Sequence, residues 1–341
     1  MNRILVLAVF GICLLSAGVA RSEQVTTLGR IERLDRAFDR LVEQDAAIEL
    51  LAANRFVWAE GPVWDPANKR VLFSDIPRNM IWEWSQASGL KEFLSPSGYT
   101  AAATFTGREP GSNGLAFNKA GELVMCQHGD RRVAKWVDGK FVTLVDRYAG
   151  KRLNSPNDLV IRSNGDVYFT DPPYGLPGTF EDPTKELPFQ GVYRVAPDGR
   201  ITLLTKELEA PNGLAFSPDY KTLYVANSQK EHAIWKAFEV KADGTLGTSR
   251  VFADVTKMYK DGDGVPDGLK VDQKGNVWAT GPGGVYVYTP EGTLLGRILT
   301  GVPTANVAWG GGSHSTLFIT ANHRVLRLRT KAHGMPLPRA R

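Results

Sequence analysis

One strand–turn–strand template recurs six times along this 341-residue chain, and this repeat constrains the fold more than any other feature. Each copy opens on a Glu, Asn or Asp, continues as a short apolar strand and turns at Gly, Asp, Pro or Asn residues. A second strand of β-branched and aromatic residues follows, which is the pattern of a β-hairpin. The copies begin at Glu60, Asn113, Asn157, Asn212, Asp267 and Asn306, at successive spacings of 53, 44, 55, 55 and 39 residues.

These spacings leave room for about four strands per copy, because further strand-like runs such as 191–195 and 284–288 follow the hairpins. Repeats of this length and content are typical of β-propeller blades. Two β-sandwiches are the alternative, but a sandwich gives no reason for one template to recur six times. We therefore predict an all-β fold, a six-bladed β-propeller over residues 51–330.

The segments on either side of the repeats have a different character. Residues 1–22 combine a basic start with an apolar run, Ile4–Ala20, and small residues near its end, which indicates a signal peptide. An uncleaved membrane anchor is the alternative, since the run approaches spanning length. Cleavage leaves Cys126 as the only cysteine, so the mature chain has no internal disulfide. We expect a periplasmic or secreted protein without a stable membrane anchor.

Residues 23–50 place apolar side chains at three- and four-residue steps among charged ones, which predicts a short N-terminal helical extension packed on the propeller. Residues 331–341 form a basic C-terminal tail that we expect to be solvated. The formal charge of +5 falls to +3 without Arg3 and Arg21, and the other basic residues are scattered. This distribution predicts no nucleic-acid partner, and it says nothing about the oligomeric state.

The first residue of each copy matters for chemistry, because the innermost strands of a propeller line its central channel. All six carry a side-chain oxygen. A turn would explain Asn or Asp but not Glu60. Such oxygens are costly to bury without a cation, and the charges of Glu60 and Asp267 match a hard divalent ion. Calcium is expected first, with magnesium or manganese as alternatives; zinc is less favoured, because the ring holds no His or Cys.

From about Ile48 to Leu328 the chain resembles the gluconolactonase branch of the SMP-30/gluconolactonase/luciferin-regenerating family. The resemblance rests on Glu60-Gly-Pro-Val-Trp, Asn154-Ser-Pro-Asn-Asp-Leu, Thr170-Asp-Pro-Pro-Tyr-Gly, Pro211-Asn-Gly-Leu-Ala-Phe-Ser-Pro-Asp and Gly264-Val-Pro-Asp-Gly-Leu-Lys-Val. It implies a six-bladed propeller with one divalent ion, often calcium, in the channel. The ligands it implies are Glu60, Asn212 and Asp267, with Asn157 completing the site or touching substrate.

The resemblance also implies that Asp267 accepts and donates the proton during hydrolysis of a small sugar lactone such as gluconolactone, while the ion polarises the carbonyl. Asn113 and Asn306 match no ligand in the family, and we expect them to hold waters or to orient the other amides.

Residues at the ends of the second strands should return to the same rim. The Pro- and Gly-rich stretch that follows Asp171 should lie at this rim as well. Of the residues at the rim, we expect Asp171, Tyr174 and His128 to bind substrate. Capping of strand ends is the alternative for them. Two other functions stay open. The same ion site would suit another lactone, an ester or an organophosphate. A non-enzymatic binding scaffold is the other alternative for a propeller, although it would not need the charges of Glu60 and Asp267.

Overall fold

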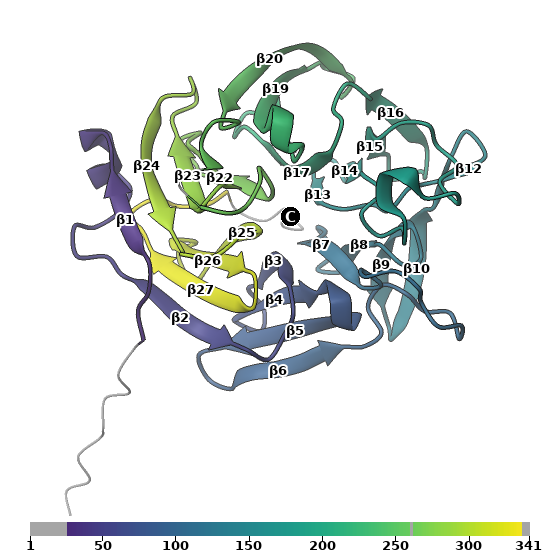
Figure 1. Cartoon of the computed structure of the whole chain (residues 1–341), viewed down its shortest axis with the longest axis horizontal. Helices are drawn as coiled ribbons and strands as arrows, with labels where there is room; N and C mark the ends of the chain where they lie inside the picture. The colour runs from purple at the N-terminus through teal and green to yellow at the C-terminus, as the bar shows by residue number, and fades with distance from the viewer. Residues whose placement is uncertain (1–25, 260–261, 336–341) are drawn as a thin grey trace, which may run out of the picture.

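The computed structural model describes residues 26–259 and 262–335, which form six antiparallel sheets around a central axis (Figure 1). The inner strand of each sheet contacts the inner strand of the next, and that of the last sheet contacts that of the first, so the ring is closed. The predicted six-bladed β-propeller is confirmed. We number the sheets as blades 1 to 6 in chain order.

Within each blade, sequence neighbours pair antiparallel from the axis outward. Blade 1 contains β3 (Ala59–Asp65), β4 (Arg70–Asp75), β5 (Met80–Ser85) and β6 (Gly89–Leu94). Blade 2 contains β7 (Ser112–Phe117), β8 (Leu123–Gln127), β9 (Arg132–Val137) and β10 (Lys140–Val145). Blade 3 contains β13 (Leu159–Ile161), β14 (Val167–Asp171), β15 (Gly191–Val195) and β16 (Ile201–Thr205).

The second half of the ring repeats this order. Blade 4 contains β17 (Pro211–Phe216), β18 (Thr222–Asn227), β19 (Ile234–Val240) and β20 (Leu246–Asp254). Blade 5 contains β21 (Leu269–Val271), β22 (Val277–Gly281), β23 (Gly284–Tyr288) and β24 (Leu294–Leu299). Blade 6 contains β25 (Asn306–Gly310), β26 (Thr316–Ala321) and β27 (Arg324–Arg329). A small pair, β11 (Arg147–Tyr148) and β12 (Lys151–Arg152), connects blades 2 and 3.

The N-terminal segment completes the last two blades. Strand β2 (Ile48–Ala53) pairs with β27 as the outer strand of blade 6, and β1 (Arg30–Arg33) pairs with β24 as a fifth strand of blade 5. The ring is therefore closed by strands from both ends of the chain, which lie side by side in Figure 1.

The predicted amphipathic helix in residues 23–50 is wrong for most of its length. Between β1 and β2 the chain forms only a five-residue 3-10 helix, η1 (Arg36–Arg40), whose first turn is capped by the Asp35 side chain. Phe38 is buried against blade 5, whereas Leu34 is 55% exposed. The physical reason is the open edge of β24: pairing there satisfies the backbone N–H and C=O groups of residues 30–33, which a short isolated helix would not stabilise better.

The predicted solvated tail is also corrected over residues 331–335. The backbone N–H of Lys331 donates to the carbonyl of Leu41 at 2.8 Å, and Gly334 forms a β-bridge with Asp272. Ala332 is buried. Backbone pairing therefore holds this stretch against blades 5 and 6. The rest of the tail and the predicted signal peptide lie outside the described residues.

The hydrophobic core is divided into clusters that lie between neighbouring blades. Trp278 of blade 5 meets Trp309 of blade 6 edge to face, with ring centroids 5.1 Å apart. Trp64 of blade 1 stacks on Phe318 of blade 6 at 5.5 Å. These large rings fill the wedge that opens between twisted sheets.

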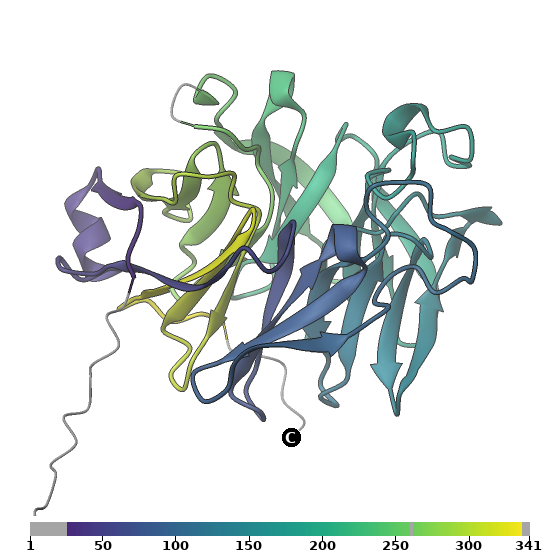
Figure 2. The ribbon, with the colours of Figure 1, turned by 60° about the horizontal axis from the view of Figure 1, so that its bottom comes forward.

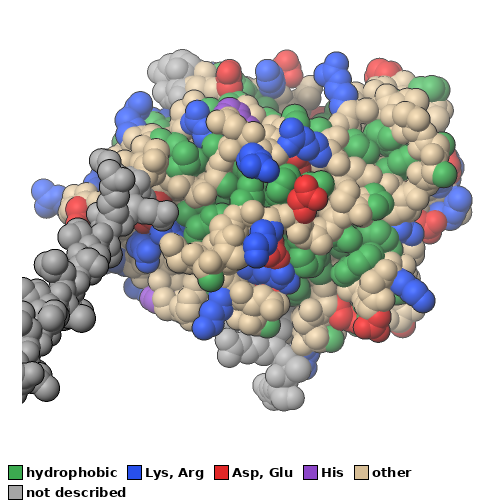
Figure 3. Space-filling model, turned by 90° about the horizontal axis from the view of Figure 1, so that it is seen from below, with side chains coloured by type: hydrophobic (Ala, Val, Ile, Leu, Met, Phe, Trp, Pro, Cys, Tyr) green, Lys and Arg blue, Asp and Glu red, His purple; other side chains and the backbone are tan. Residues whose placement is uncertain are grey.

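The two ends of the ring differ. The turns that carry the 3-10 helices η2 (Ile76–Arg78), η3 (Thr179–Glu181) and η4 (Lys230–His232) gather at one end, uppermost in Figure 2, which we call the upper face. On the side shown in Figure 3, basic and acidic side chains are interspersed with apolar ones. No helix in the described part of the chain has the length and apolar character needed to cross a membrane.

Candidate metal centre

Four of the residues that open the repeats lie at the start of an innermost strand, whereas Asn157 and Asp267 lie two residues before theirs; all six are buried. A glycine follows the ring residue in four blades, and it permits close approach of neighbouring strands. A Cβ atom built on Gly213 would lie 2.3 Å from the carbonyl oxygen of Asp267, and one on Gly61 would lie 2.0 Å from that of Asn113. Only glycine fits there, so the template brings its polar residues close to the axis.

Hydroxyl groups on the second strands fix the backbone of this ring. Ser74 donates to the carbonyl of Asn113 at 2.8 Å, and Thr170 donates to that of Asn212 at 2.7 Å. Each hydroxyl therefore holds the ring residue of the next blade. We did not single out these residues from the sequence, although a Ser or Thr at the end of the second strand recurs at positions 74, 170, 280 and 320.

A cavity of about 290 Å³ opens at the upper face above the ring. Its lining includes five of the six ring residues and Tyr174, all of which the sequence had indicated as candidates: Glu60, Asn113, Asn157, Asn212, Asp267 and Tyr174. The other lining residues were missed by the sequence reasoning: Trp58, Ile76, Glu109, Ser228 and Val265.

Several oxygens in this lining are buried without a hydrogen-bond partner. They are Oδ1 of Asn113, Oδ1 of Asn157 and Oδ1 of Asp267. Unpaired buried oxygens are rare because they lose their hydration without compensation. Within residues 26–259 and 262–335, no three His, Cys, Asp or Glu side chains form a metal-binding group. The unpaired oxygens of Asn113, Asn157 and Asp267 fit a cation that accepts mixed carboxylate and amide oxygens, as calcium does.

The electrostatics of the two ring carboxyl groups support the same interpretation. Burial raises the pKa of Glu60 to about 7, although the N–H of Gly61 donates to its Oε2 at 2.9 Å and opposes the shift. Burial, and then the neighbouring Glu60 charge, raise the pKa of Asp267 well above its ordinary value. Two carboxylates this close resist ionising together, and a divalent cation between them would remove that cost.

Asn306 lies below the cavity and is not part of its lining. Its Nδ2 donates to Oδ2 of Asp158 from the opposite blade at 3.2 Å, and its side chain also hydrogen-bonds Glu60. The prediction that Asn306 orients the other amides stays a prediction, because these two partners of its side chain are carboxyl groups. Asp158 was missed by sequence reasoning, because it occupies the template position that holds glycine in four other blades.

His128 is fully buried beside the cavity and is not among its lining residues. Its Nδ1 lies 3.0 Å from Oε2 of Glu109, and its Nε2 lies 3.5 Å from Nδ2 of Asn113. On another wall, Tyr174 hydrogen-bonds Ser228, which also accepts from Nδ2 of Asn212 at 3.0 Å. Burial raises the pKa of the Tyr174 hydroxyl, so the group stays protonated and able to donate.

Asp171 does not line the cavity. Its side chain is fully buried at the end of β14, where Oδ2 accepts from the N–H of Asn154 at 2.8 Å. This geometry matches the capping alternative, and substrate binding by Asp171 stays a prediction without a contact to support it.

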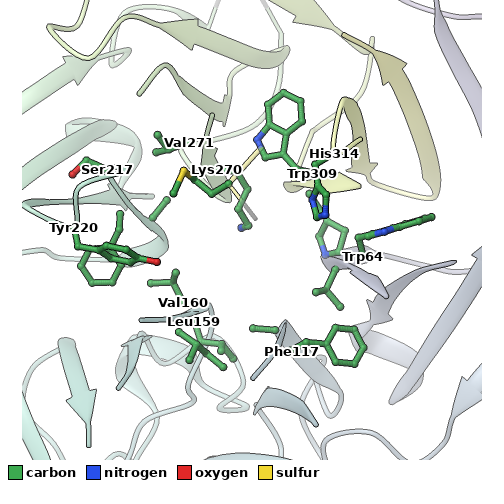
Figure 4. Close-up of a pocket in the computed structure, with 18 residues that line it drawn as sticks. Trp64, Phe117, Leu159, Val160, Ser217, Tyr220, Lys270, Val271, Trp309 and His314 are labelled. Atoms are coloured by element: carbon green, nitrogen blue, oxygen red, sulfur yellow. The ribbon is translucent and has the colours of Figure 1, made fainter. Parts of the chain in front are cut away.

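The opposite end of the channel has a different lining. A cavity of about 160 Å³ there is mostly apolar, with Trp64, Phe117 and Trp309 on its walls, as the close-up shows (Figure 4). Among the described residues that line this cavity, Lys270 is charged, and His314 is the only other one that can carry a charge. The polar residues suited to hydrolysis are therefore confined to the upper end.

Comparison with known proteins agrees with this architecture. Residues 58–323 match the model of the SMP-30/Gluconolactonase/LRE-like region, which is most of the chain. The chain belongs to this family. The family resemblance inferred from the motifs is thus confirmed.

Individual relatives refine the placement within the family. The chain is 40% identical to a gluconolactonase of Zymomonas mobilis over 91% of its own length and 88% of the relative's. It superposes with a TM-score of 0.78 on a gluconolactonase structure from Xanthomonas campestris, at 33% identity, covering 92% of this chain and 99% of that one. A calcium-binding regucalcin structure from Agrobacterium tumefaciens shares the fold, at 20% identity and a TM-score of 0.67, over 86% of this chain and 96% of that one.

Proposed function

We propose that this lactonase hydrolyses a sugar lactone of the gluconolactone type to its aldonic acid, with one divalent cation, calcium first, held in the upper cavity. The observation that carries the proposal is the convergence of two carboxylates and two amides, from four different blades, on one cavity. Glu60, Asn157, Asn212 and Asp267 would hold the ion. When bound, the cation would polarise the lactone carbonyl as a Lewis acid and keep both carboxylates ionised.

Asp267 is the residue best placed to move the proton. It is buried, it lines the cavity, and its Oδ1 has no hydrogen-bond partner among the residues that the structure describes. An ionised Asp267 would take a proton from the attacking water and return it to the ring oxygen of the lactone as the C–O bond breaks. A weak base of this kind suits an activated ester such as a lactone better than an amide.

The remaining lining suits a small polar substrate. Tyr174 and Ser228 offer hydroxyl groups on one wall, and the amide of Asn113 lies in the lining next to His128. Trp58, Ile76 and Val265 supply apolar surface that limits access of water around the substrate. A cavity of about 290 Å³ with this mixture accommodates a single sugar ring better than a polymer.

The proposal is tested on mature protein that has been stripped with a chelator and assayed on glucono-1,5-lactone by proton release. Calcium, magnesium, manganese and zinc are added back separately. We expect calcium to restore turnover, and we expect Asp267→Asn to lower kcat by at least about 10²- to 10⁴-fold, the usual contribution of a general base.

The other outcomes have distinct meanings. Tight metal binding without lactone turnover would shift the function to another ester or to an organophosphate at the same centre. Full activity in the chelator-treated protein would refute the metal dependence. Turnover that survives Asp267→Asn would exclude this residue as the base.

A further inference from the structure

Glu109 occupies a wall of the upper cavity that the repeat does not account for. It lies in the connection between β6 and β7, outside the six-fold template, and its side chain is 33% exposed. The charge of Glu109 raises the pKa values of Glu60 and Asp267 through space, without a hydrogen bond to either. Glu60 and Asp267, in contrast, hydrogen-bond one another. Glu109 therefore faces the candidate metal centre without belonging to its ligand set.

One oxygen of this carboxylate lies against a confined imidazole, in a close contact without an aligned hydrogen bond. Oε2 of Glu109 lies 3.0 Å from Nδ1 of the fully buried His128. The His128 ring is itself confined, because a Cβ atom on Gly175 would come within 2.5 Å of its Cβ. The next residues of the loop are also fixed: the N–H of Gly111 donates to the carbonyl of Ile76, and its carbonyl accepts from the N–H of His128.

Neither oxygen of this lining carboxylate has a hydrogen bond among the described residues, and Oε1 also lies outside the close contact with His128. A carboxylate is an acceptor only, and its hydrogen bonds to hydroxyl donors are stronger than those between neutral groups. The hydroxyl groups of a sugar lactone are such donors. A lactone without hydroxyl groups would leave this charge desolvated and unpaired, which penalises its binding.

We propose that Glu109 selects hydroxylated lactones, by accepting a hydrogen bond from a ring hydroxyl of the bound substrate, and that His128 is the positioning residue that holds its carboxylate. This proposal rests on the lactonase function proposed above, and it adds a specificity-determining residue to it. The residue acts on substrate recognition and leaves the metal site unchanged.

The test compares two lactones with the same six-membered ring, glucono-1,5-lactone and the unsubstituted δ-valerolactone, in wild-type and Glu109→Ala protein with saturating calcium. We expect kcat/KM for gluconolactone to fall by about 10- to 100-fold, the usual effect of losing a hydrogen bond to a charged group. We expect kcat/KM for δ-valerolactone to stay the same or rise. Calcium affinity, measured by calorimetry, should fall much less than kcat/KM for gluconolactone, because the charge of Glu109 reaches Glu60 and Asp267 only through space.

Glu181→Ala is the matched control, because this exposed glutamate lies on η3 at the same face and does not line the cavity. It should leave both substrates unaffected. Equal losses on both lactones, or a loss of calcium affinity as large as the loss of kcat/KM, in Glu109→Ala would overturn the selectivity role. A wild-type protein that hydrolyses neither lactone would instead refute the proposed function, so the two failures are distinguishable.

His128 is tested by a pair of substitutions. His128→Asn keeps an N–H near the position of Nδ1, whereas His128→Ala removes it. We expect His128→Ala to raise KM for gluconolactone with little change in kcat, and His128→Asn to recover most of the loss. Identical behaviour of the two variants, with thermal unfolding showing both to be folded, would contradict the positioning role.

Discussion

Two buried aspartates show how similar chemistry at the residue scale leads to different roles. The pKa values of both Asp267 and Asp171 are raised by burial. Asp267 lines a cavity together with unpaired amide oxygens, but Asp171 accepts from the backbone N–H of Asn154 and does not line that cavity. A carboxyl group with a shifted pKa thus identifies a candidate site only when other polar groups line the same cavity.

Asp171 should make stability depend on pH. Burial raises its pKa to about 7, and the Asn154 N–H and the Arg131 charge offset only part of the shift. The folded state then binds more protons than the unfolded state between about pH 4 and pH 7. The contribution of Asp171 to the free energy of unfolding therefore falls as pH rises through this window.

Asp171→Asn removes that proton uptake and keeps an acceptor for the Asn154 N–H. We expect the variant to gain stability relative to wild type between about pH 5 and pH 8, by a few kcal/mol at most, in urea titrations with saturating calcium. A difference between the two proteins that does not vary with pH would show that Asp171 is ionised throughout.

Most of the candidate centre could be predicted because it follows the repeat. One position in the template is shared by Glu60, Asn157, Asn212 and Asp267. The propeller brings residues at this position together around its axis. Glu109 lies in an irregular connection, where neither periodicity nor spacing indicates which way a side chain points.

At the scale of strands, the glycines after the ring residues set the width of the channel. Gly213→Ala would place a Cβ atom 2.3 Å from the Asp267 carbonyl, so blades 4 and 5 would have to separate. We expect a loss of at least about 1–3 kcal/mol in the free energy of unfolding, the range for overpacking, and reduced turnover because Asp267 moves.

Gly312→Ala is the appropriate comparison, because no atom lies within 4 Å of the place that its Cβ would occupy. Its unfolding curve in urea should match wild type to within about 0.5 kcal/mol, as is usual for surface substitutions. Equal stability of the two variants would mean that the inner strands tolerate separation.

The N-terminal segment shows where local pattern fails for an element. The apolar spacing of residues 28–41 suits a helix, yet β1 pairs with the open edge of blade 5. That edge exists only after blade 5 has formed, so the residues around β1 do not by themselves indicate that β1 will pair with β24. The six blades were predictable because each is built from consecutive residues.

For the whole molecule, ion binding should couple to stability. An ion that binds only the folded state adds about 2.7 kcal/mol at a concentration about one hundred times its Kd. We expect calcium to raise the Tm of the stripped protein by several degrees.

Glu60→Gln should raise the Tm measured without calcium, because it removes a buried charge. The same variant should show a smaller calcium-induced rise in Tm than wild type. A calcium response unchanged in this variant would place the ion elsewhere.

The pairing of β2 with β27 has a consequence for how the protein is made. Ile48 lies opposite Leu328, so the last blade cannot form until almost the whole chain has left the ribosome. Contacts this distant in sequence form slowly, because a long loop must close before they contribute. During synthesis the chain therefore stays an open array of blades, and the ring closes only once the residues near Leu328 are free to pair with β2.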